Sequence, residues 1–241
     1  MLPRDALLQG SRDPDALSGL ISLSEDALRT WEPRWSGFVA ADLREEAEHR
    51  LGALSELHLS SDGGYPGAER RCLLLQRAEL APPPETTSPA SAVPLAGLIV
   101  SGNFLFDPAE PDDVRRGLLE AGAQAGELGD IWMRGDRGAQ AVMTAAAADH
   151  LHGTTATVRT VEVSLECVPL AQLQPPAQRN PRELSSVEAS RRLDAVASAG
   201  FGLSRSRMAD LIRGGAVRVN WQPVTSPSRD LACGDRVQLA G

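Results

Sequence analysis

The chain has 241 residues, of which 42% are hydrophobic and 23% charged, the composition of an ordinary globular protein. Its longest apolar run falls far short of the ~20 residues of a membrane-spanning helix, and no basic segment followed by an apolar core predicts a signal peptide. Three widely separated cysteines argue against a disulfide framework, so we expect a cytoplasmic protein of two or three small domains.

Charge is distributed unevenly along the sequence. All 24 basic residues are arginine. Residues 1–178 contain 14 arginines and 26 acids, a net charge of −12, whereas residues 179–241 contain 10 arginines and 6 acids, a net charge of +4. A basic end on an acidic body predicts that the C-terminal segment binds an anionic partner, most simply nucleic acid.

Residues 1–80 are expected to form an N-terminal domain of mixed α/β structure. Apolar residues at helical spacing predict one helix around 17–21 and a second over 43–54. A turn-rich stretch then precedes a predicted strand at 72–80. The next segment, 81–94, has five prolines and predicts a linker that is stiff where the prolines cluster.

Residues 95–178 are expected to form a middle domain in which strands and helices alternate. The predicted elements, in chain order, are a strand at 95–104, a helix capped by Asp112 or Asp113 and ending at 121, strands at 130–134 and 139–144 around the hairpin sequence GDRG, a helix at 144–153, and one strand at 157–168. This β-α-β-β-α-β order predicts a ferredoxin-like sheet with two helices on one side, the architecture of an RRM. The predicted fold class is therefore α+β.

The aromatic residues of this middle domain do not match those of a working RRM, which stacks RNA bases on its two central strands. The third strand reads GAQAVMT, and the first reads GLIVSGN. We therefore interpret the domain as an RRM-like scaffold without that RNA-binding face. Phe104, Phe106 and Trp132 are predicted to lie in its core.

Residues 182–241 are expected to form a third domain, after a second proline-rich linker at 172–184. Ser185 and Glu188 match a capping box ahead of a helix that ends at Gly200. Ser204 is predicted to cap a second helix, which Gly214 ends. Alternation at 217–220 and 236–239 predicts two short strands.

Six short elements follow one another in this segment: RLD (192–194), LSRSR (203–207), LIRGG (211–215), VRVN (217–220), PS (227–228) and GD (234–235). Their order and spacing resemble the S4 (αL-type) RNA-binding domain of a ribosomal protein, tyrosyl-tRNA synthetases and pseudouridine synthases. Arginine suits such a role because its guanidinium group forms bidentate hydrogen bonds with phosphate. The residues expected to bind RNA are Arg192, Ser204, Arg205, Arg207, Arg213, Arg218, Asn220 and Trp221.

Two alternatives remain open at this surface. The arginines can instead belong to a solvated helix face, with salt bridges to Asp194 and Asp210. Trp221 stands where most S4 domains have a glycine after the Val-Asn pair. Its indole can stack on a base or ribose, or it can act as a lid over the small core.

The whole chain resembles a narrower family, the photosystem II S4 domain proteins of cyanobacteria. The resemblance is carried by GGYPGAER (63–70), SGNFLFDPAE (101–110), GDIW (129–132), LSRSRMADLIR (203–213) and VNW (219–221). Members join an N-terminal domain, an RRM-like domain and a C-terminal S4 domain. Relatives in other bacteria lie in a cell-division gene cluster, and some bind large ribosomal subunits that carry a stalled peptidyl-tRNA.

The resemblance implies a non-enzymatic protein that binds structured RNA. That RNA would be rRNA or tRNA on the ribosomal large subunit, in stalled-ribosome quality control. The alternative that it implies is a photosystem II assembly or regulatory protein that acts through protein contacts.

Signals for catalysis or metal binding are weak. His150 and His152 are two residues apart and would point about 200° from each other on a helix, a poor metal pair. The GFG at 200–202 lacks the third glycine of a dinucleotide fingerprint, and Asp136 has no evident catalytic partner. A third hypothesis is an RNA-modifying enzyme, but the sequence shows neither a methyl-donor glycine loop nor a catalytic aspartate motif. We expect no enzyme activity, no cofactor and no metal.

Overall fold

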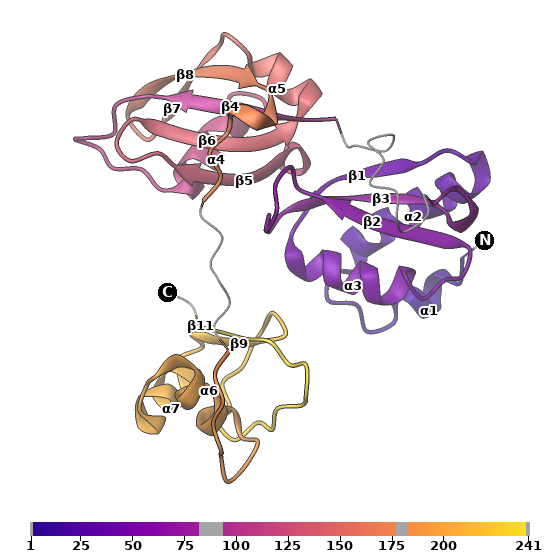
Figure 1. Cartoon of the computed structure of the whole chain (residues 1–241), viewed down its shortest axis with the longest axis vertical. Coiled ribbons are helices and arrows are strands. Elements are labelled where there is room, and N and C mark those ends of the chain that lie inside the picture. Colours follow the sequence, from indigo (N-terminus) through magenta and orange to yellow (C-terminus); the bar gives the residue numbers. More distant parts are fainter. Residues whose placement is uncertain (1, 82–93, 177–182, 240–241) are drawn as a thin grey trace. The chain divides into compact units, whose positions relative to one another are not determined.

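The computed structural model describes residues 2–81, 94–176 and 183–239 (Figure 1). The chain divides into two compact units, Met1–Gln178 and Arg179–Gly241. The predicted linker at 81–94 lies almost wholly outside the described residues, as does the middle of the linker predicted at 172–184. None of the helices in the described parts of the chain combines the length and apolar character that a bilayer crossing requires.

The first unit begins with a three-stranded antiparallel sheet in the order β1-β3-β2. Its elements are α1 (Arg4–Leu8), α2 (Pro14–Thr30), β1 (Arg34–Val39), α3 (Ala41–Leu51), β2 (Leu57–Asp62), β3 (Arg71–Arg77) and the 3-10 helix η1 (Ala78–Leu80). The two predicted helices and the predicted strand are confirmed as α2, α3 and β3. The sequence analysis missed α1, β1 and β2, because the polar residues of the two strands weaken their apolar alternation.

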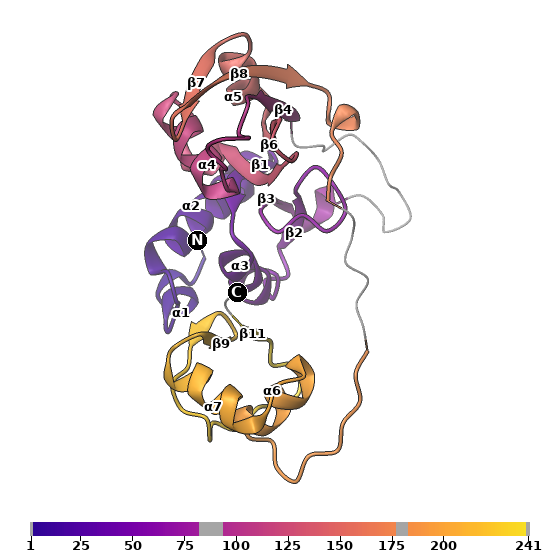
Figure 2. The same ribbon diagram turned by 90° about the vertical axis from the view of Figure 1, so that its left-hand side faces the viewer.

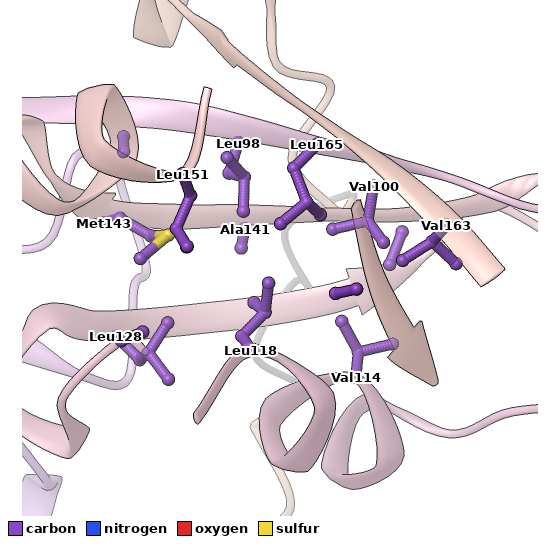
Figure 3. Close-up of a cluster of buried hydrophobic side chains, with 14 of the residues drawn as sticks. Leu98, Val100, Val114, Leu118, Leu128, Ala141, Met143, Leu151, Val163 and Leu165 are labelled. Carbon is purple, nitrogen blue, oxygen red and sulfur yellow. The ribbon is translucent and has the colours of Figure 1, made fainter. Parts of the chain in front are cut away.

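The second sheet of this unit has five antiparallel strands in the order β5-β6-β4-β8-β7. Its elements are β4 (Leu95–Ser101), α4 (Pro111–Glu120), η3 (Ala125–Glu127), β5 (Leu128–Met133), β6 (Gly138–Thr144), α5 (Ala145–Leu151), β7 (Thr155–Val158), β8 (Val161–Val168) and η4 (Leu170–Gln172). Without β7, this is the order of a ferredoxin-like fold, so that prediction is confirmed. Both helices pack on one face, around a core that includes Leu98, Leu118 and Leu165 (Figure 3).

Two local predictions in the middle domain are wrong. The single strand predicted at 157–168 is a hairpin of β7 and β8, which turns at Arg159 with a left-handed φ of 57°. The cap of α4 is Glu110, whose side chain and that of Asp113 form a reciprocal capping box. The Asp113 side chain thus accepts a hydrogen bond from the backbone amide of Glu110, the cap residue, and Asp113 is not the cap itself.

The aromatic residues of the middle domain divide between core and surface. Phe104 and Trp132 are buried as predicted, but Phe106 is 90% exposed, so its assignment to the core is wrong. Phe106 follows a turn in which the Asn103 side chain accepts a hydrogen bond from the Leu105 amide, after β4 has ended. The chain there has left the sheet, and strand alternation no longer decides which way a side chain points.

The sheet face opposite α4 and α5, which an RRM uses to bind RNA, is covered by the unit's own residues. Trp132 and Val142 pack there with Phe38 of β1 and with Leu173. The Trp132 indole also donates a hydrogen bond of 2.9 Å to the carbonyl of Gln174. This burial supports the interpretation of the middle domain as a scaffold, and it explains why β6 is buried on both faces.

Asp130 joins the two sheets of the first unit. Its carboxylate accepts hydrogen bonds from the Tyr65 hydroxyl at 2.8 Å, the Glu69 amide at 2.7 Å and the Arg70 amide at 3.0 Å. Burial, with the hydrogen bond to Asp130, raises the pKa of Tyr65, so its hydroxyl stays a donor. The GGYPGAER and GDIW motifs therefore meet, and what they form is a structural link.

The second unit contains two helices on one side of a small antiparallel sheet in the order β10-β9-β11 (Figure 2). Its elements are α6 (Leu193–Phe201), α7 (Arg205–Arg213), β9 (Val217–Val219), β10 (Gln222–Pro223) and β11 (Val237–Leu239). The predicted caps of α7 are confirmed: the Ser204 hydroxyl accepts from the Arg207 amide at 3.3 Å, and Gly214 ends the helix.

The capping box predicted at Ser185 and Glu188 is wrong, because α6 begins only at Leu193 and both residues lie in exposed coil. The first amides of α6 find backbone acceptors: Leu193 donates to the carbonyl of Arg229 at 2.7 Å and Asp194 to that of Pro227 at 3.0 Å. No capping side chain is needed there. The helix ends at Phe201, one residue past the predicted Gly200.

We predict that Asp130→Ala lowers the free energy of unfolding by about 2–4 kcal/mol, because three donors lose a charged acceptor. Urea unfolding of the full chain measures this change. Asp136→Ala, in the exposed turn before β6, is the matched control and should stay within about 0.5 kcal/mol of the wild type. Equal effects of the two substitutions would show that Asp130 is not a structural link.

Candidate nucleic-acid interface

A carboxylate buried in the first turn of α6 organises the arginines of the second unit. The Asp194 side chain is only 7% exposed. It accepts from Arg192 through Nε at 3.1 Å and Nη2 at 2.9 Å, and from Arg205 Nη2 at 3.2 Å. Arg205 is the first residue of α7, so this cluster ties the start of α7 to the start of α6.

The cluster sets the ionisation of Asp194. The two hydrogen bonds from Arg192, and then the one from Arg205, lower the pKa of Asp194 to about 2, while burial opposes them. The carboxylate is therefore ionised at neutral pH, and two arginines share one negative charge. The salt bridges of Arg192 and Arg205 to Asp194, expected as the alternative to RNA binding, are therefore present in the structure. The RNA-binding role of these two arginines stays a prediction.

Arg213 forms the other expected salt bridge. Its Nη1 lies 3.0 Å from Asp210 Oδ1, one turn earlier on α7. Both side chains are exposed, so the pair contributes at most about 0.5 kcal/mol to stability. Arg213 can therefore readily exchange Asp210 for another anion.

Arg207 and Arg218 differ from the other arginines expected to bind RNA. Both are exposed, and within the described residues neither makes an ion pair. Arg207 points about 200° around α7 from Arg205, so the structure does not bring these two neighbours in sequence together. Arg218 projects from β9 between the buried Val217 and Val219.

Asn220 and Trp221 form the turn between β9 and β10. The Asn220 side chain donates to Asp235 at 2.7 Å and accepts from the Arg236 amide at 2.9 Å, so it is a structural residue of the turn. Trp221 is partly exposed, and the Arg236 guanidinium lies 5.5 Å from the centre of its ring.

Three further arginines of this unit were missed by reasoning from the motif alone: Arg191, Arg229 and Arg236. All three are exposed. Residues 191–239 contain eight arginines and four acids, a net charge of +4, and this count was the signal that pointed to them. The unit thus presents positive charge beyond the motif, as an RNA-binding surface requires.

Metal ligands are not grouped in the described parts of the chain, where no set of three or more His, Cys, Asp and Glu side chains is placed to hold an ion. His152 is exposed, and its Nδ1 accepts a hydrogen bond of 3.1 Å from the Cys167 amide. The Cys167 thiol donates to Asp149 at 3.3 Å, and its pKa is raised by burial and by that carboxylate, the opposite of an activated nucleophile.

Two family models match the chain. The S4 domain matches residues 191–237, and the model described as YlmH, N-terminal matches residues 12–80. Residues 191–237 therefore match an S4 domain and residues 12–80 a YlmH-type N-terminal domain. The predictions of an S4 domain and an α+β fold are confirmed.

Comparison with individual proteins agrees with these domains. The chain is 28% identical over 187 residues to the ribosome-associated protein quality control protein P2 of Bacillus subtilis (strain 168), covering 78% of this chain and 70% of that protein, and the two are homologous. Its fold is similar to that of the cell division protein ylmH from Streptococcus pneumoniae. There the TM-score is 0.50 at 18% identity, over 66% of this chain and 93% of that one.

Lowering the pH should destabilise the second unit, because Asp194 then becomes protonated. Because its folded pKa of about 2 lies below the ordinary 3.8, ionised Asp194 stabilises the fold above about pH 4, and this stabilisation is lost as the pH falls to 2. We predict that Asp194→Asn costs about 1–2 kcal/mol at pH 7, since the partly exposed arginines are screened by solvent. The difference from wild type should shrink steadily below pH 4 and be mostly lost by pH 2.

Urea unfolding of the full chain between pH 2 and 7, followed by NMR signals of α6 and α7, measures this difference. Asp210→Asn is the matched control, because it removes a surface carboxylate that also pairs with arginine, and it should change little at any pH. A cost of Asp194→Asn that does not depend on pH would contradict the ionic role.

Proposed function

We propose that the protein binds structured RNA on the ribosome through its S4 domain and catalyses no reaction. The observation that carries the proposal is an S4 domain with a net charge of +4 in which Arg207 and Arg218 are exposed without an ion pair among the described residues. The homologous Bacillus protein is described as ribosome-associated and as part of protein quality control.

The finer assignment is to rRNA or tRNA on the large subunit, in stalled-ribosome quality control in the cytoplasm. Two features support assigning RNA to the second unit alone. Residues 1–178 carry a net charge of −12, which repels phosphate, and the RRM-like sheet is covered on the face that an RRM offers to RNA. The photosystem II alternative gains no support, since the two relatives named above are described by ribosome association and by cell division.

We predict that the full-length protein co-sediments with isolated large ribosomal subunits at low salt and is released as the salt concentration rises. Sucrose gradients with separated large and small subunits measure this binding. Because the proposed contacts are ionic, release should be complete at several hundred millimolar salt. Migration with small subunits, or with free protein at every salt concentration, would contradict the assignment.

Removing the two arginines that lack ion pairs should weaken RNA binding and reduce its dependence on salt. For Arg207→Gln with Arg218→Gln, we predict that the slope of log affinity against log salt becomes shallower by about 1–2, since each contributes about one phosphate contact. The melting temperature should stay within a few degrees, because both side chains are exposed.

Binding of an RNA hairpin at several salt concentrations measures the slope. Arg137→Gln, at an exposed arginine of the acidic unit, is the matched control and should change neither affinity nor slope. A double variant with the wild-type slope would exclude these arginines from the interface.

Arg205→Glu is a poor probe, because it sets a second carboxylate beside Asp194 and disturbs the α6–α7 contact.

A further inference from the structure

The turn between β9 and β10 holds a tryptophan in an unfavourable backbone conformation. Val219 pairs with Gln222, so Asn220 and Trp221 form a two-residue hairpin loop. Their φ angles of 50° and 70° are both left-handed, as in a type I′ turn. Such a turn favours Asn followed by Gly, and a large side chain at the second position is costly.

The turn does not need the indole to form. Its geometry is held by Asn220, whose amide donates to the Arg236 carbonyl at 2.8 Å and whose side chain bonds to Asp235 and to the Arg236 amide. Asp235 is held in turn by the Ala232 amide at 2.8 Å. A glycine would satisfy the same left-handed backbone better than a tryptophan does.

Core packing does not account for the tryptophan either. The hydrophobic cluster of this unit, among the described residues, is built from α6, α7 and the strands with Val224 and Leu231, and Trp221 is not a member. Strain at a residue that neither the turn nor the core requires points to a binding role.

The surroundings of the indole suit a nucleotide. Arg236, an exposed side chain, places its guanidinium 5.5 Å from the ring centre. An indole offers a π face on which any base stacks, and a neighbouring guanidinium adds cation–π attraction and a phosphate contact. The pair lies in a unit of net charge +4, with Arg218 on the strand that leads into the turn.

We propose that Trp221 and Arg236 bind one unpaired nucleotide of the RNA, with its base stacked on the indole. Arg218, on the strand that leads into the turn, binds a phosphate of the adjoining helix. The proposal rests on the proposed function, and it adds that the protein distinguishes a helix with an unpaired base from a continuous helix. Stacking makes this preference independent of salt, whereas the arginines make the affinity dependent on it.

The first test uses the wild-type full chain and three RNA hairpins: one fully paired, one with a single bulged nucleotide, and one with an abasic site at the bulge. We expect the bulged hairpin to bind about tenfold tighter than the other two, the size of one base–aromatic stack. Equal binding of all three would overturn this inference and leave the proposed function standing. Binding to none of them would count against the proposed function itself.

The second test replaces Trp221 with glycine, which the left-handed backbone favours. Trp221→Gly should melt at or above the wild-type temperature, lose the tenfold preference for the bulge, and keep the wild-type salt slope. Phe106→Ala, at a more exposed aromatic residue of the acidic unit, is the control and should keep the preference. If Trp221→Gly keeps the preference, or weakens paired and bulged hairpins equally, the nucleotide site is wrong.

Discussion

The ionised carboxylate of Asp194 is the constraint on which the second unit depends. A charge this well buried must be paired, and Arg192 and Arg205 supply the partners from the starts of both helices. The same turn of α6 takes its backbone acceptors from the loop at 227–229, so one region joins α6, α7 and the segment that leads to β11. The arginines held there stabilise the fold, whereas Arg207 and Arg218 make no ion pair among the described residues.

The first unit presents neither the open sheet face of an RRM nor a basic surface. Its five-stranded sheet is buried on both faces, by α4 and α5 on one side and by β1 with the 170–174 segment on the other. Asp130 maintains this arrangement by accepting three hydrogen bonds from the 65–70 loop. The RRM-like sheet thus packs against the N-terminal sheet with the face that an RRM uses for RNA. The negative charge of this unit also repels phosphate.

Much of the architecture followed from local patterns. The ferredoxin-like order and the caps of α7 were predicted correctly, because periodicity, caps and turn residues act over a few positions. The S4 domain was predicted correctly from the resemblance of its six short elements to that family. The errors lie where local signals conflict with long-range contacts. Val158 and Val161 are three residues apart, so the alternation changes phase at Arg159 and Thr160, but the prediction of a single strand overlooked this signal. Ser185 with Glu188 resembles a capping box although α6 starts elsewhere.

The sequence by itself determined the fold class, the charge division and the identity of the basic motif, since these depend on composition and short-range spacing. Only the tertiary structure decided which arginines are paired. Arg205 and Arg207 are both exposed and equivalent in the motif, yet Asp194, eleven residues before Arg205, pairs with Arg205 and not with Arg207. It likewise decided that Phe106 is exposed and that Trp221 sits in a left-handed turn. Burial and pairing are set by residues distant in the chain, and no local pattern records them.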